Sequence, residues 1–171
     1  MRGVNEIEKS AFNSCHDLSD IDFDKLEIIE HYSFAWCTSL RSVNLPSIRR
    51  VGHNAFARCR GLTDVVFGVK LERIEEIAFF NCTALRSISI PLKDNLIIAN
   101  NSFNYCENIS RVDVIGGIHK TISSLHLESW RVEMMEEIDR INQTLPNRRA
   151  IEKTEAIREW ITRVLQRMEH Y

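Results

Sequence analysis

The amino-acid sequence lacks the features of a membrane-inserted, exported or nucleic-acid-binding chain. No apolar run approaches the roughly 20 residues that a helix needs to cross a bilayer, and the start MRGVNEIEKSAF has no apolar stretch of a secretory signal. The formal net charge is only -2, so no strong field attracts nucleic acid or a charged membrane. We therefore expect no nucleic-acid partner, no membrane insertion and a cytoplasmic location, unless an upstream signal segment directs the protein to the cell surface.

The patterns of common metal and catalytic sites are also missing. Metal ligands usually come as close pairs such as C-x-x-C, but the five cysteines are at least 22 residues apart. The six histidines include no H-E-x-x-H, and no serine has the flanking glycines of a nucleophile elbow. We predict no cofactor, no metal ion and no catalytic residue, and hence no enzyme.

What the sequence does contain is one unit repeated five times. Its phenylalanines are Phe12, Phe34, Phe56, Phe79 and Phe103, at spacings of 22, 22, 23 and 24 residues. A small residue precedes each phenylalanine, and a branched aliphatic residue lies five positions before it. A cysteine follows each phenylalanine by three residues: Cys15, Cys37, Cys59, Cys82 and Cys106. A nearly constant period of this length predicts a solenoid, in which each unit stacks on the next.

The cysteine column has two interpretations. Stacked units would bring successive sulfur atoms within about 5-6 Å, a distance from which disulfide bridges are conceivable. Cysteine is also a small, largely apolar residue that fills one position of a core. Because the number of cysteines is odd, bridging would leave one thiol unpaired. We favour the core interpretation.

Each unit also contains a short alternating pattern that predicts a β-strand. Two apolar positions have one residue between them, as at Val43 and Leu45 or at Ile88 and Ile90. The residue between them and the residues on either side are mostly polar. Pro46 and Pro91 directly follow these two segments and would end strand pairing. Stacking pairs these strands in parallel, about 4.8 Å apart per unit.

These residues resemble the BspA-like subclass of leucine-rich repeats. The fourth unit carries the pattern as Ile74-x-x-x-Ala78-Phe79-x-x-Cys82-x-x-Leu85-x-x-Ile88-x-Ile90-Pro91. The resemblance covers residues 4 to about 115, although the glycine that the family often has after the aliphatic residue is kept only at Gly52. It implies an α/β leucine-rich-repeat solenoid, with parallel strands on one face and irregular or short helical turns on the other. It also implies protein binding or surface attachment as the function.

The C-terminal part has a helical pattern instead. Apolar residues at steps of 3, 4, 4, 3 and 4, from Leu127 to Leu145, predict an amphipathic helix over about 122-143. Pro146 breaks it, and a second apolar series runs from Ile157 to Tyr171. We divide the chain into five repeats in residues 1-117 and a helical hairpin in residues 118-171. Because solenoid ends expose core residues, we expect the first helix to cap the fifth unit.

Two surfaces are candidates for binding a protein partner. The strand face consists of the polar positions that alternate with the apolar ones in the predicted strands: Asp20, Asp22, Asn44, Asp64, Arg111 and Asp113. The aromatic column is the position just before the cysteine, with Trp36, Arg58 and Tyr105 in three of the five units. Trp36 and Arg58 lie in adjacent units, so they could form a cation-π pair, anchor a partner or simply pack on neighbours.

The sequence therefore predicts a non-catalytic protein-protein interaction module whose partner is not identified. An alternative is a structural element in which the C-terminal helices mediate oligomerisation. Its basis is an apolar surface larger than one cap obviously needs, formed by Trp130, Ile138, Ile157, Trp160 and Val164. A fragment of a cell-surface attachment protein is another alternative. For the N-terminal edge we predict one of three arrangements: it is bare, it continues upstream into a longer repeat array, or it pairs with another copy of the chain.

Overall fold

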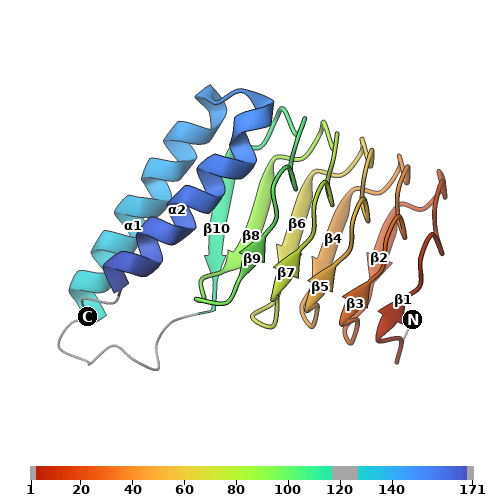
Figure 1. Ribbon diagram of the computed structural model, residues 1–171, viewed down its shortest axis with the longest axis horizontal. Coiled ribbons are helices and arrows are strands. Elements are labelled where there is room, and N and C mark those ends of the chain that lie inside the picture. Colours follow the sequence, from red (N-terminus) through yellow and green to blue (C-terminus); the bar gives the residue numbers. More distant parts are fainter. Residues whose placement is uncertain (1–2, 117–126, 169–171) are drawn as a thin grey trace.

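The computed structural model describes residues 3-116 and 127-168, which form five stacked turns followed by two helices (Figure 1). The stack runs from the N-terminal end to the helices, which lie side by side against its C-terminal end. The expected solenoid with a helical cap is confirmed. Residues 117-126, which include the predicted start of the first helix and the domain boundary, lie outside the described residues.

The predicted strands form one parallel sheet, ordered β10-β8-β6-β4-β2. The strands are β2 (Asp20–Asp22), β4 (Ser42–Leu45), β6 (Asp64–Phe67), β8 (Ser87–Pro91) and β10 (Arg111–Ile115). Their alternation places the apolar side chains inward: Val43 and Leu45 are buried, while Asn44 between them is exposed. Pro91 is the last residue of β8 and not, as expected, the residue after the strand.

A second parallel sheet corrects the expectation of strands on one face only. It is ordered β1-β3-β5-β7-β9, and each strand has two residues. The strands are β1 (Glu6–Ile7), β3 (Ile28–Ile29), β5 (Arg50–Val51), β7 (Arg73–Ile74) and β9 (Ile97–Ile98). Each ends on the branched aliphatic residue that lies five positions before the phenylalanine. Two residues are too few for an alternating pattern, so only the stacking of equivalent segments reveals this sheet.

The repeated phenylalanines form a continuous ring stack through the core. Successive ring centroids are 5.2, 5.2, 5.1 and 5.3 Å apart, and the ring planes are within 14° of parallel. Phe34, Phe56, Phe79 and Phe103 are fully buried, whereas Phe12 in the first turn is partly exposed. Aromatic contacts add to the large apolar area that each ring buries, so this column supplies much of the stabilisation between turns.

The cysteines form a second internal column and are all free thiols. The Cys59 Sγ donates to the carbonyl oxygen of Phe34 in the preceding unit at 3.0 Å. Cys37, Cys82 and Cys106 donate in the same way at 3.0 to 3.1 Å. These four thiols are fully buried. The core interpretation is therefore confirmed, and within the described residues no group of histidine, cysteine or acidic side chains has the geometry of a metal site.

We expect the protein to lose stability above about pH 9 because its thiols are buried. Burial raises the pKa of Cys37 from 9.0 to about 12, so between these values the folded chain keeps a proton that the unfolded chain releases. Raising the pH through this window favours unfolding by up to about 1.4 kcal/mol per pH unit for one thiol. Urea unfolding between about pH 8 and pH 10.5 measures the slope. The slope should be shallower for Cys37→Ala, and equal slopes would contradict this account.

The helical hairpin continues the hydrogen bonding of the turns at the C-terminal end of the stack. It comprises α1 (Leu127–Thr144), two 3-10 turns and α2 (Lys153–Met168). In the inner units the phenylalanine N–H donates to the carbonyl before the next phenylalanine, as from Phe79 to Ser102 at 2.8 Å. The last one, Phe103, donates instead to the Thr154 hydroxyl at 3.0 Å. A side-chain oxygen of α2 thus replaces the carbonyl of a further repeat.

Two more side chains of the hairpin bind the backbone of the fifth unit. Asn142 on α1 accepts from the N–H of Val112 at 2.7 Å and donates to its carbonyl at 3.3 Å, so it pairs with β10 much as a neighbouring strand would. Lys153 is buried and its Nζ donates to the carbonyl oxygens of Glu107 at 2.5 Å and Ile109 at 2.7 Å. Both helices therefore cap the fifth unit, not the first one alone.

The apolar surface that suggested oligomerisation through the helices is used within the chain. Trp130, Ile157, Trp160 and Val164 are buried, and Ile138 packs on the same core while partly exposed. These residues no longer favour assembly through the hairpin, although association of copies stays a prediction. Among the helices that the structure describes, none has the length and apolarity to cross a membrane.

Candidate functional site

The strand face brings its predicted residues together in two rows. Parallel pairing aligns one row across the sheet, which consists of Asp20, Ser42, Asp64, Ser87 and Arg111. The second row consists of Asp22, Asn44, Val66, Ser89 and Asp113. Most of these side chains are short and polar, and the acidic ones lie in β2, β6 and β10. The strand face therefore consists mainly of short polar side chains and has no large aromatic side chain at its centre that could anchor a partner.

Three charged residues of the strand face, Asp64, Arg111 and Asp113, already interact with neighbouring side chains. Hydrogen bonds from the hydroxyls of Thr63 and Ser87 lower the pKa of Asp64 from its ordinary value, and Ser87 lies 2.7 Å from the Asp64 carboxylate. Arg111 donates to both carboxylate oxygens of Asp113 at 3.0 and 2.9 Å. These interactions organise the C-terminal half of the face, while Asp20, Asp22, Ser42 and Asn44 are exposed in its N-terminal half.

The aromatic column lies on the turns that carry the phenylalanine and cysteine columns. The Arg58 guanidinium lies over Trp36, 4.3 Å from the ring centroid, which confirms the cation-π pair. It also lies 5.9 Å from the Phe80 centroid. Phe80 in turn meets Tyr105 edge to face at 5.3 Å. These four residues form a continuous surface across four turns, in which Trp36 is 38% and Tyr105 47% exposed.

The backbone of this column is left-handed in every unit. Positive φ angles occur two residues before and two residues after each phenylalanine, at Ser10, Ser14, Tyr32, Trp36, Asn54, Arg58, Ile77, Asn81, Asn101 and Tyr105. Asparagine tolerates this region, whereas a bulky side chain there is unusual. Tyr32, Trp36 and Tyr105 nevertheless have φ angles of 59, 64 and 59°. The turn explains the backbone, but it does not explain why aromatic residues occupy these positions.

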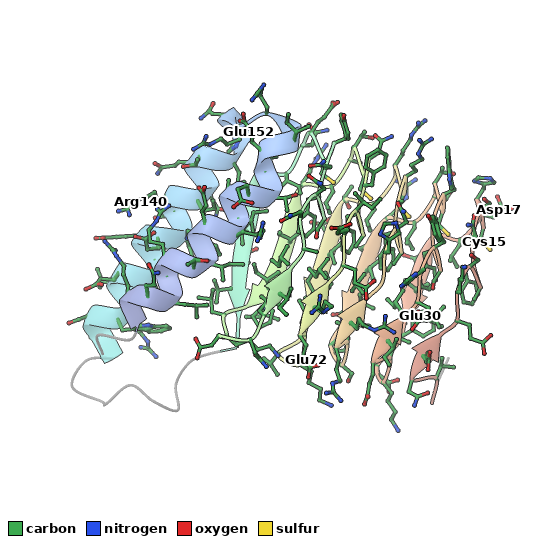
Figure 2. All side chains as sticks on the ribbon, viewed as in Figure 1. Cys15, Asp17, Glu30, Glu72, Arg140 and Glu152 are labelled. Carbon is green, nitrogen blue, oxygen red and sulfur yellow. The ribbon has the colours of Figure 1, made fainter. Side chains whose placement is uncertain are left out.

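Two charged clusters were not predicted from the sequence. On the second sheet, the Glu75 carboxylate accepts from Arg50 at 3.1 Å and from the His53 N–H at 3.0 Å, and Arg50 also pairs with Glu30. In the hairpin, Glu137 is 2% exposed and meets arginines from both helices. Figure 2 shows Glu30 on the stack and Arg140 on the hairpin, at separate places. Neither cluster has a local sequence motif, because its members come from different turns or helices.

Comparison with known proteins relates the chain to repeat proteins. A family model for the BspA type leucine rich repeat region matches residues 3-136 with six copies. Among solved structures, a leucine rich cell surface protein from Faecalibacterium prausnitzii is 32% identical, with a TM-score of 0.59. The alignment covers 65% of this chain and 29% of that chain, so the chain spans less than a third of that protein. No curated protein matches.

The residues matched by the family model largely coincide with the part of the chain that forms the stacked turns. The match includes all five turns, and its last residues, 127-136, lie in α1. The buried phenylalanine and cysteine columns and the paired strands all lie within the matched residues. The chain belongs to the BspA-type leucine-rich repeat family.

Proposed function

We propose that this chain is a non-catalytic interaction module that binds a protein partner through the aromatic column. The observation that carries the proposal is the exposure of Trp36 and Tyr105 in a left-handed backbone conformation that aromatic residues rarely adopt. Tryptophan, tyrosine and arginine are also the residues enriched at binding hot spots. Asn81 has the same left-handed backbone at the equivalent position. The fold therefore does not require an aromatic residue there.

The comparisons support this proposal at the level of the family. The similar solved structure is that of a leucine rich cell surface protein, and this favours a surface location over the cytoplasmic one expected from the sequence. Antibody labelling of intact cells compared with permeabilised cells distinguishes the two locations.

The strand face is the second candidate surface, because its exposed polar residues lie in two ordered rows.

We expect Trp36→Asn to weaken binding of a captured partner about 30-fold, the effect of removing one hot-spot residue of roughly 2 kcal/mol. Asparagine keeps the left-handed backbone, as Asn81 does at the same position, so the free energy of unfolding should change by less than about 1 kcal/mol. The partner is captured by the wild-type chain from an extract of the source organism, identified by mass spectrometry and titrated against purified variants.

Three further variants locate the surface. Tyr105→Asn should also weaken binding, whereas Met135→Asn removes an exposed apolar residue of α1 and should leave it unchanged. Asp22→Arg reverses an exposed charge of the strand face. If Asp22→Arg weakens binding and both aromatic variants do not, the partner binds the strand face and the aromatic column is not the site.

A further inference from the structure

A basic cleft lies between the two helices of the hairpin, and its lining includes no residue of either candidate protein-binding surface. Its volume is about 130 Å³, and its lining includes Arg140, Arg148 and Arg163, together with Thr144, Glu159 and the wall residue Trp160. Figure 2 shows Arg140 on the helices at one end of the molecule and Cys15 at the opposite end of the stack. Three guanidinium groups against one carboxylate give the lining an excess of positive charge.

The buried carboxylate next to this cleft does not neutralise it. Arg140 and Arg167 lie 2.6 and 2.8 Å from one oxygen of Glu137, while Arg163 is 3.8 Å from the other. One carboxylate therefore faces three guanidinium groups. Within the described residues its second oxygen is buried and receives no hydrogen bond, so the 3.8 Å ion pair leaves the N–H groups of Arg163 for another acceptor. Arg167 is not part of the lining, so the cleft and its neighbour Glu137 together set four arginines, Arg167 included, against the two carboxylates of Glu137 and Glu159.

Arg148 adds a donor set that the fold does not use. It follows the 3-10 turn Leu145–Asn147, and its backbone N–H donates to Leu145. Within residues 3-116 and 127-168, its exposed side chain has no hydrogen bond or ion pair, and its charge acts, after that of Arg149, on the Glu152 carboxylate. An arginine presents several N–H groups in a planar fork that fits the oxygens of a phosphate group. The cleft thus offers unused donors beside a fixed positive charge.

The walls of the cleft favour binding of an anion over simple hydration of the arginines. Ile141 is buried, Trp160 is only 1% exposed, and its ring N–H already donates to the Glu137 carbonyl at 3.0 Å. Apolar walls lower the local dielectric constant and strengthen charge interactions. The volume of about 130 Å³ is several times the roughly 10-15 Å³ that one water molecule needs by the same measure. This is room for one tetrahedral oxyanion.

We propose that the cleft between α1 and α2 binds a phosphate group through Arg140, Arg148 and Arg163. The group is either free phosphate or the phosphorylated side chain of another protein, because both present the same oxygens. The site is independent of the proposed protein-binding surfaces and of their partner.

Isothermal titration calorimetry tests the site with the full chain near pH 7.5, where phosphate is mostly dianionic. Sodium phosphate should bind above a sodium chloride background of equal ionic strength, which controls for screening. Arg148→Gln combined with Arg163→Gln should weaken binding at least about tenfold. Arg131→Gln removes a charge from an exposed position of α1, nine residues from Arg140 and therefore on the opposite face of the helix, and should bind as the wild type does.

The outcomes separate the possibilities. Phosphate heat no larger than that of chloride, or an equal loss in Arg131→Gln, overturns the proposal. If the double variant is not folded by circular dichroism, Arg148→Gln alone is used, because that side chain is exposed. A blocked phosphoserine that binds tighter than inorganic phosphate, with no binding of blocked serine, identifies a phosphorylated partner. Equal affinity of the two phosphates identifies free phosphate.

Discussion

Replacing Phe56 with alanine is expected to lower the free energy of unfolding by about 4 kcal/mol, which is typical for replacing a buried phenylalanine with alanine. Phe56 is fully buried at the middle of the ring stack, 5.2 Å from Phe34 and 5.1 Å from Phe79. Its removal leaves a cavity between two turns and ends two ring contacts at once. Urea unfolding followed by circular dichroism measures the loss.

The end of the same column provides the matched control. Phe12 is partly exposed and contacts only Phe34 among the stacked rings, so Phe12→Ala should cost about half as much. If Phe56→Ala does not fold, Phe56→Leu keeps most of the volume and should cost about 1 to 1.5 kcal/mol. Equal losses for Phe12→Ala and Phe56→Ala would show that the stack does not supply the coupling between turns.

Replacing Lys153 with methionine is expected to cost about 3 kcal/mol. Methionine keeps the length of the side chain but removes both hydrogen bonds to the carbonyls of Glu107 and Ile109. Hydrogen bonds from a charged donor contribute about 1.5 to 3 kcal/mol each. Relief of the desolvation that lowers the pKa of Lys153 offsets part of this loss. Urea unfolding again measures the change.

The control for Lys153 is a lysine outside the cap. Lys25 is exposed, so Lys25→Met should change the free energy of unfolding by less than about 0.5 kcal/mol. Thr154→Val, which removes only the acceptor for the Phe103 N–H, should cost about 1 to 2 kcal/mol. If Lys153→Met is as stable as the wild type, the cap is held by apolar packing and not by these bonds.

The candidate surfaces were only partly predictable. Asp22 and Asn44 follow from alternation, because alternate residues of a strand point to the same side. The contact between Trp36 and Arg58 follows from their equivalent positions in adjacent units. Their left-handed backbone does not follow, since nothing in the local preference of tryptophan favours it. The stacked turn imposes that conformation.

The sequence by itself determined the period, the inward columns of phenylalanine and cysteine, the longer strands and the existence of two C-terminal helices. These features repeat at fixed spacing, so a one-dimensional pattern records them. Only the tertiary structure decided the second sheet, the pairing of Asn142, Lys153 and Thr154 with the fifth unit, and the meeting of Arg140 and Arg163 around Glu137. Each of these depends on backbone or side-chain groups that are far apart in the chain and come together only after the turns and helices have packed.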